Sequence, residues 1–293
     1  PGRLRSAQCS VLLGKNGGSE QRRRTPGVFK HPPGRSNADT KYQRSSNGGY
    51  EILSSIEKMP KNEFLKARWI NLLMLNYEVD PAVLAPYIPP ATELDLWQGK
   101  ALVSMVGFLF KDTAVKGIKW PLHINFDEVN LRFYVKHFNG KEWKRGAVFI
   151  SEIVPKPFIA TIANLLYKEH YRAMPMRHSI DDMPGGLTKY LYEWKFDGRW
   201  NNRLGGTVSD ADIHPIVPGS QEEFIFEHYW GYNKISKTKT REYQVEHITW
   251  SAANVIDPIF EADVAQLYGK EFVPYLERKP YSAFFADGSE VIV

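Results

Sequence analysis

The chain is poor in cysteine and has no long apolar run. Cys9 is the only cysteine in 293 residues, so no intrachain disulfide forms, and zinc ribbons and cysteine nucleophiles in the folded part are excluded. The richest apolar stretch, residues 101–110, is shorter than the roughly 18 residues that a membrane-spanning helix needs, and it contains Ser104 and Gly107. These absences predict a cytoplasmic protein with no membrane partner.

The best-known catalytic signatures are also missing. The sequence contains no Walker A motif, no GxGxxG, no HExxH and no GxSxG, and its eight histidines are scattered. Phosphotransfer, hydride transfer on a dinucleotide fold and metalloprotease chemistry are therefore disfavoured. We expect no bound metal and no cofactor.

The excess positive charge is confined to the start of the sequence. Residues 1–58 carry 11 basic and 4 acidic residues, a net charge of +7. Residues 59–293 carry 27 basic and 29 acidic residues, a net charge of −2, and they contain all eight tryptophans. The total of +5 thus describes a basic segment joined to a slightly acidic body.

The first 58 residues have the composition of a disordered tail. Glycine, proline, serine, asparagine and arginine dominate, so the segment buries too little apolar surface to offset its ordering entropy. Such an arm could bind nucleic acid or anionic lipid. Met59, however, opens a composition typical of a protein start, which favours plain disorder or non-native upstream sequence. The predicted organisation is a disordered basic tail over 1–58 and a single domain over 59–293.

Short β-rich runs between turn signals dominate the body. Asn139-Gly140 is the favoured pair for a type I′ hairpin turn, Asp197-Gly198 gives a similar signal, and Gln98 to Lys100 form a loop that contains glycine. Asp287-Gly288 predicts a turn in the last strand region. The expected strands cover residues 67–79, 92–97, 101–110, 126–138, 142–153, 190–196, 199–208, 241–251 and 281–293.

Few helices are expected. Asp80 is a good N-cap for a short helix over 81–87. Apolar periodicity predicts a helix over 157–168, and Ser220 with Glu223 forms a capping box that opens another. The predicted fold class is mainly β (α+β), with an antiparallel sheet that curls into a closed barrel or cone around a small-ligand cavity.

One strand carries polar residues where a core should be apolar. Within residues 125–135, alternation places Glu128, Asn130, Arg132 and Tyr134 on one face and apolar residues on the other. In an ordinary sheet the polar face would be exposed to solvent. In a barrel it could line the cavity, and Arg132 would then anchor an anion, because guanidinium pairs with carboxylate through two hydrogen bonds.

A second candidate lies where a strand meets the predicted helix over 157–168. Lys156 falls at or near the helix start, after Glu152. The helix dipole and desolvation both favour the neutral amine there, which an imine-forming lysine needs. The alternative interpretation is an exposed lysine with a small dipole penalty.

Two aromatic segments, Glu227 to Trp230 and Glu246 to Trp250, form the third candidate. Trp230 and His247 could contact a ligand in a pocket wall. An ordinary core rim has the same composition and is slightly favoured.

Five stretches of the body, taken together, resemble a known family. They read NYEVDP at 76–81, WQGKALVSMVGF at 97–108, EVNLRFYV at 128–135, RGAVFISEI at 145–153 and VEHITW at 245–250. In this order they resemble the YqjF-like family of uncharacterised conserved proteins, grouped with the acetoacetate decarboxylase-like superfamily. The resemblance covers residues 66–260 and implies a closed, cone-like antiparallel β-barrel around a central cavity.

The resemblance also bears on activity. True acetoacetate decarboxylases use a lysine that forms an imine with the substrate ketone, followed by a second lysine that activates it, in a Pro-Lys-Lys context. The comparable stretch here reads Pro155-Lys156-Pro157. Lys156 would thus be the imine lysine, and Pro157 replaces the activating one, which puts decarboxylation in doubt without excluding imine chemistry.

Three functional hypotheses follow. The first is a lyase that acts through an imine on Lys156, with Glu152 or Glu128 moving protons. The second is a non-catalytic barrel that binds a small organic carboxylate or carbonyl compound. The third and weakest is nucleic-acid binding through the basic tail. Oligomeric state stays open, and the candidate ligand contacts are Arg132, Asn130, Tyr134, Trp230 and His247.

Overall fold

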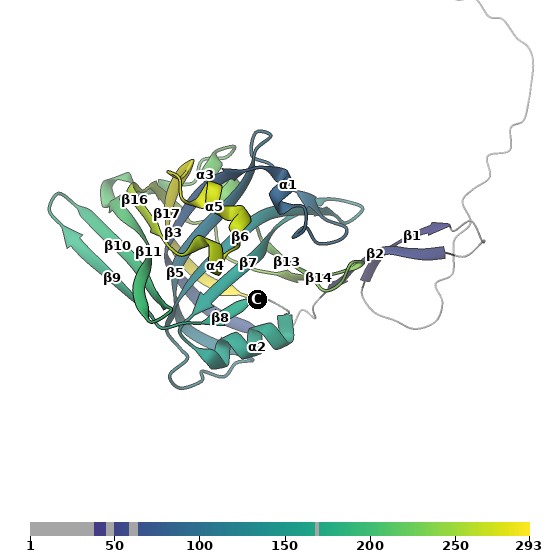
Figure 1. Cartoon of the computed structure of the whole chain (residues 1–293), viewed down its shortest axis with the longest axis horizontal. Helices are drawn as coiled ribbons and strands as arrows, with labels where there is room; N and C mark the ends of the chain where they lie inside the picture. The colour runs from purple at the N-terminus through teal and green to yellow at the C-terminus, as the bar shows by residue number, and fades with distance from the viewer. Residues whose placement is uncertain (1–37, 45–49, 59–63, 168–169) are drawn as a thin grey trace, which may run out of the picture. The chain divides into compact units, whose positions relative to one another are not determined.

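The structure is a computed structural model, which describes residues 38–44, 50–58, 64–167 and 170–293. Within these ranges the chain is mainly β and forms two sheets (Figure 1). The large sheet consists of β1 (Ala38–Arg44), β2 (Tyr50–Lys58), β3 (Leu65–Val79), β4 (Glu93–Leu94), β5 (Ala101–Val115), β6 (Phe126–Phe138), β7 (Trp143–Val154), β8 (Tyr171–Ala173), β12 (His214–Pro215), β13 (Trp230–Lys234), β14 (Lys239–Gln244), β15 (Ser251–Asn254) and β17 (Ser282–Ile292).

The small sheet and five short α-helices complete the described elements. The small sheet has the order β16-β11-β10-β9. Its strands are β9 (Met176–Met183), β10 (Leu187–Phe196), β11 (Arg199–Ser209) and β16 (Ile256–Glu261). The helices are α1 (Pro81–Leu84), α2 (Pro157–Tyr167), α3 (Gln221–Phe226), α4 (Val264–Leu267) and α5 (Val273–Leu276).

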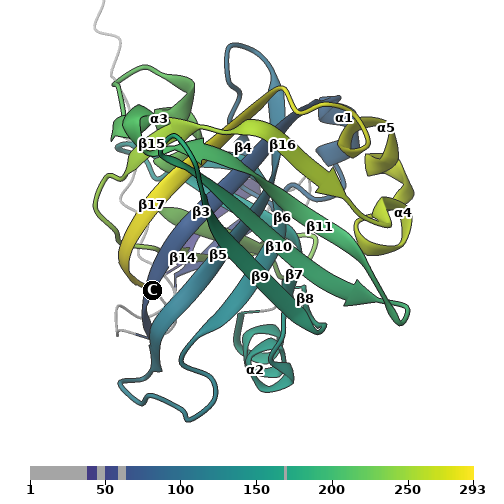
Figure 2. The same cartoon turned by 90° about the vertical axis from the view of Figure 1, so that its left-hand side faces the viewer.

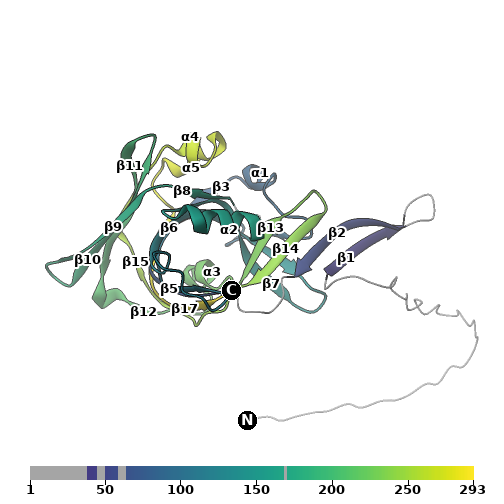
Figure 3. The same ribbon diagram turned by 90° about the horizontal axis from the view of Figure 1, so that it is seen from below.

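The large sheet curls on itself but does not close (Figure 3). Its strand order is β1-β2-β14-β13-β7-β6-β5-β3-β17-β15-β12, with β4 paired to β6 and β8 paired to β7. The strand expected over 241–251 ends at Gln244, and beyond it only Glu246 forms a bridge, with Ile292 of β17. A single bridge does not pair this segment with β17 as a continuous strand. The prediction of a mainly β fold is confirmed, whereas that of a closed barrel is wrong for the described residues.

Most turn signals act as predicted, and two do not. The hairpins β6–β7 and β10–β11 form, with Gly140 and Gly198 at φ of +95° and +74°. Short β4 pairs with β6 rather than β5. At Asp287-Gly288, β17 continues along β3 instead of turning, with Gly288 at φ +86°. A Cβ at Gly288 would lie 1.9 Å from the carbonyl oxygen of Trp69, so glycine here permits close backbone approach.

Helix starts follow local sequence. The Asp80 carboxylate accepts a hydrogen bond from the N–H of Ala82 at 2.8 Å, and the Ser220 hydroxyl accepts one from Glu223 at 3.2 Å. The Glu223 carboxylate in turn accepts from the N–H of Gly219 at 2.7 Å. The predicted helices at 81 and 221 form with side-chain caps for their first N–H groups, and at Pro81 and Pro157 the first residue carries no N–H that needs a partner.

The two faces of the large sheet bury different cores. On the outer face, Val129, Leu131 and Phe133 of β6 pack in one cluster with Trp194 and Leu204 of the small sheet. Figure 2 shows the small sheet lying across this face, with α4 and α5 beside it. On the inner face a second cluster joins side chains of β3, β5 and β6 to α3. The curl therefore has an interior of its own, distinct from the outer core.

Strands β1 and β2 lie within the first 58 residues, and the disorder of that segment stays a prediction. The other residues of that segment lie outside the described ranges. No helix in the described part of the chain is both long and apolar enough to cross a bilayer.

Candidate functional site

A cavity of about 110 Å³ lies inside the curl of the large sheet. Its wall is mostly aromatic and aliphatic and comes from β3, β5, β6, β7 and α2, with Trp69, Phe108, Phe110, Phe149 and Ile159 among the lining side chains. Figure 1 shows α2 and the β5–β6 connection at one end of the curl and α3 at the other. Trp120 of that connection and Phe158 of α2 also line the cavity, so its mouth is at their end.

Four polar side chains interrupt the apolar wall on one side. Glu128, Asn130 and Arg132 project inward from β6, and Glu152 projects inward from β7. The strand register places Glu152 directly opposite Asn130. The polar face predicted for residues 125–135 is therefore an interior face. This interior placement follows from the curl, because alternation alone is equally compatible with solvent exposure.

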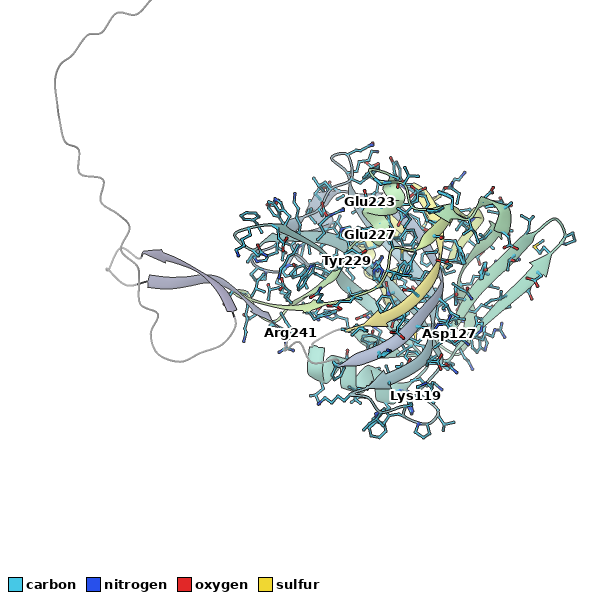
Figure 4. All side chains as sticks on the ribbon, turned by 180° about the vertical axis from the view of Figure 1, so that it is seen from behind. Lys119, Asp127, Glu223, Glu227, Tyr229 and Arg241 are labelled. Carbon is cyan, nitrogen blue, oxygen red and sulfur yellow. The ribbon has the colours of Figure 1, made fainter. Side chains whose placement is uncertain are left out.

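The β6 residues form levels along the axis of the cavity. Phe126 stands at the mouth, and the chain then runs inward through Glu128 and Asn130 to Arg132, at about 7 Å for every two residues. Figure 4 supports this direction, since Lys119 of the β5–β6 connection lies at the end opposite Glu223 of α3. Arg132 is thus the deepest polar group and Glu128 the one nearest the mouth.

Two carboxylates in the wall are almost fully buried, because Glu128 and Glu152 are each 2% exposed. Glu128 accepts hydrogen bonds from the side-chain amide of Asn130 at 2.9 Å and from the hydroxyl of Tyr171 at 3.1 Å. These bonds fix the carboxylate of Glu128 in the wall. In the described part of the chain, no three His, Cys, Asp or Glu side chains are grouped to hold a metal ion.

Arg132 is a half-buried cation whose contacts are weak. Its Nη2 lies 3.3 Å from the sulfur of Met74 and 3.4 Å from the carbonyl oxygen of Ile225 in α3, and its guanidinium lies 5.7 Å from the ring of Tyr134. Its Nε is buried without a hydrogen-bond partner. Among the described residues no carboxylate pairs with it. A guanidinium group can form two hydrogen bonds with a carboxylate.

Tyr134 shares the inner face but does not line the cavity. Its hydroxyl lies 2.6 Å from the hydroxyl of Ser104, which also donates to Asn76 at 2.5 Å. Its ring packs against His228, with centroids 4.5 Å apart. Tyr134 therefore lies further along β6 than Arg132 and outside the cavity wall.

Lys156 is half-exposed and is not among the residues that line the cavity. It directly precedes α2, and its carbonyl oxygen accepts from the N–H of Ala160 at 3.1 Å. The side chains of α2 that do reach the cavity are Phe158, Ile159 and Ile162. The prediction of Lys156 at a helix start is confirmed, and its catalytic role stays a prediction.

Trp230 and His247 also lie outside the cavity wall. The Lys144 ammonium sits 3.7 Å from the ring centre of Trp230. His247 stacks on Trp250 at 4.1 Å and packs against Tyr229 at 4.7 Å. The structure thus brings the two aromatic segments together as a half-buried cluster beside the cavity.

A buried polar group that sequence reasoning missed joins Asp95, Arg145 and His228. Asp95 Oδ2 accepts from Arg145 Nε at 2.6 Å and lies 3.2 Å from His228 Nε2. Burial raises the pKa of Asp95, but the hydrogen bonds from His228 and Arg145 outweigh it and lower that pKa overall. Burial lowers the pKa of His228 to about 4. No local motif signals this group, because 133 residues separate Asp95 from His228.

The buried histidine predicts a loss of stability in mild acid. His228 has a folded-state pKa of about 4, against about 6.5 in an unfolded chain. Between these values the unfolded state binds the extra proton, so the free energy of unfolding falls by about 3 kcal/mol as the pH falls through this window. Urea denaturation at several pH values should show this slope, and His228→Gln should flatten it. Equal slopes in the two proteins would contradict the assignment.

The sequence matches one family model over residues 66–290, most of the chain. That family is DUF2071, described as an uncharacterized conserved protein (COG2071). The chain belongs to the DUF2071 family. This confirms the resemblance to YqjF-like proteins. No curated protein sequence matches this DUF2071 protein.

Solved structures of the acetoacetate decarboxylase-like fold are similar to this DUF2071 protein. An acetoacetate decarboxylase-like enzyme from Sphingomonas wittichii RW1 has a TM-score of 0.53 at 13% identity, over 78% of this chain and 90% of that one. Acetoacetate decarboxylase from Legionella pneumophila has a TM-score of 0.52 at 13% identity, over 78% and 84%. The enduracididine biosynthesis enzyme MppR, complexed with the condensation product of pyruvate and imidazole 4-carboxaldehyde, has a TM-score of 0.55 at 14% identity, over 80% and 88%. At these identities the likeness establishes the fold alone.

Proposed function

We propose that this DUF2071 protein binds a small organic carboxylate, with its anionic group on Arg132 and its apolar part against the aromatic wall. The observation that carries the proposal is the guanidinium of Arg132. It lies at the inner end of an apolar cavity with no carboxylate partner among the described residues. A bound carboxylate would supply two strong hydrogen bonds and the missing negative charge.

The size of the cavity limits the ligand. A dry engineered cavity of about 150 Å³ accommodates benzene, which has six non-hydrogen atoms. By the same ratio the cavity of about 110 Å³ here encloses about four. The carboxylate group of a short carboxylic or oxo acid and the carbon next to it fill this space, and further atoms would extend toward Trp120 and Phe158 at the mouth.

The two buried carboxylates support lyase-type chemistry on such a ligand. Glu152 stands opposite Asn130, one level nearer the mouth than Arg132, so it is within reach of the atoms that follow the anchored carboxylate. A buried carboxylate can remove a proton beside a carbonyl group and return it. The solved complex of MppR with pyruvate shows that a protein of this fold accepts a short oxo acid.

An imine mechanism would need an amine in the cavity. No lysine is found among the described residues that line it. The proposal therefore assigns proton transfer to Glu152, with Glu128 as its neighbour, and does not require Lys156. Imine formation becomes an outcome that the experiment can detect.

Ligand selectivity tests the binding proposal. Trp69 and Trp120 line the cavity, so their fluorescence should respond to binding. We expect short oxo and aliphatic acids to bind at least about tenfold more tightly than the matching amides, because an amide lacks the charge that pairs with Arg132. Equal affinity for acids and amides would overturn the proposal.

Two chemical readouts test the mechanism. Deuterium uptake from D2O beside the carbonyl of a bound oxo acid should be lost in Glu152→Gln, while that variant still binds the acid. Borohydride trapping followed by intact mass should give no adduct. An adduct that disappears in Lys156→Ala would overturn the carboxylate assignment and support the imine lysine instead.

A further inference from the structure

The mouth of the cavity is surrounded by exposed apolar side chains. Ile118, Trp120 and Leu122 come from the β5–β6 connection, and Phe158 and Leu165 come from α2. Leu122 and Leu165 are 83% and 72% exposed, well above an ordinary surface leucine. We call these five residues the apolar rim.

The apolar rim forms one patch. The rings of Trp120 and Phe158 lie 5.6 Å apart, which joins the connection to the helix. Leu165 follows Phe158 by seven residues, so both occupy the same face of α2. Figures 1 and 2 show α2 beside the β5–β6 connection at the same end of the curl. Contiguous exposed apolar patches of this kind mark interaction surfaces.

The charge around the apolar rim is opposite in sign to that of the body. The described residues of the two segments that carry the apolar rim, 116–125 and 155–167, contain three lysines and no acidic residue, and Lys119 forms an exposed ion pair with Asp112 at 3.4 Å. The body over 59–293 has a net charge of −2. The patch therefore combines apolar side chains with clustered positive charge, which is what an anionic lipid surface attracts.

We propose that the apolar rim docks on the surface of an anionic lipid bilayer, with the mouth of the cavity facing the lipid. Leucine and tryptophan side chains enter the interface, while the lysines remain among the headgroups. A second copy of the chain is a poorer occupant, because two rims of the same positive charge repel each other. The inference differs from the expectation of no membrane partner, and it does not depend on which ligand fills the cavity.

Vesicle sedimentation of the full chain tests the inference. We expect binding to phosphatidylcholine vesicles that contain phosphatidylglycerol and little binding to phosphatidylcholine alone. The double variant Leu122→Ser/Leu165→Ser should lose at least about tenfold in partitioning, since each buried leucine contributes strongly. Neither leucine lines the cavity, so the fluorescence response to small ligands should persist. Lys116→Glu/Lys119→Glu should show a similar loss.

Substitutions of the same kind at surface positions outside the apolar rim serve as controls. Val217→Ser removes an exposed apolar group next to α3, and Lys237→Glu/Lys270→Glu makes the same charge change away from the mouth. These variants should partition as the parent protein does. Absence of binding to anionic vesicles, or binding that the rim variants leave unchanged, would overturn the inference. A change of oligomeric state in the leucine variant would also overturn it in favour of a protein interface.

Discussion

Arg132→Met is expected to weaken binding of a short carboxylate ligand by about tenfold to a hundredfold. Hydrogen bonds to a charged group contribute about 1.5–3 kcal/mol each, and 1.4 kcal/mol corresponds to a factor of ten. Methionine retains much of the apolar stem of arginine and removes only the guanidinium. Titration of tryptophan fluorescence with a carboxylic acid and its amide measures the effect, and the difference between the two ligands should disappear.

The free energy of unfolding of Arg132→Met distinguishes a binding role of Arg132 from a structural role. Arg132 has no carboxylate partner in the described part of the chain, so the substitution breaks no ion pair. The free energy of unfolding should change by less than about 1 kcal/mol. Arg132→Lys should recover only part of the affinity, because an ammonium group cannot form the bidentate pair. Full affinity in Arg132→Met would contradict the proposed anchor.

Lys144→Met is expected to lower the free energy of unfolding by about 3–5 kcal/mol. Lys144 Nζ lies 2.8 Å from Glu242 Oε1, and their side chains are 11% and 1% exposed. Without the lysine, Glu242 keeps only one side-chain partner among the described residues, the hydroxyl of Tyr232 at 3.1 Å. The buried negative charge is then left uncompensated. Urea denaturation measures the loss.

Two further variants test this explanation. In Lys144→Met/Glu242→Met the buried charge is also removed, so much of the lost stability should return. Arg199→Ala breaks an ion pair with Asp197 whose side chains are 70% and 77% exposed, and it should cause no measurable loss. If the double variant is no more stable than Lys144→Met, the ion pair is not the cause.

Residues close in sequence determined the elements that could be predicted. Asn139-Gly140 formed its hairpin, and Asp80 and Ser220 capped their helices, because these contacts span only a few residues. Asp287-Gly288 looks the same locally, yet β17 passes straight through it, held by pairing with β3 more than two hundred residues earlier. At this position the pairing of β17 with a distant strand, and not the local turn sequence, determines the path of the backbone.

For the candidate site, too, local sequence predicted some features and left others undetermined. Alternation in β6 identified Glu128, Asn130, Arg132 and Tyr134 as one polar face, and the first three line the cavity. Local sequence also placed Lys156 at a helix start. It could not show which side of α2 faces inward, and Ile159 and Ile162 take that position instead.

By itself the sequence determined that this protein is mainly β, where most of its hairpins and helices begin, and which residues of β6 share a face. These properties depend on backbone conformation and on neighbours within a few residues. Only the tertiary structure decided that the polar face lines a cavity and that the sheet remains open beyond Gln244. Both depend on the curl of the sheet, which arises from pairing between distant strands and cannot be deduced from any single segment.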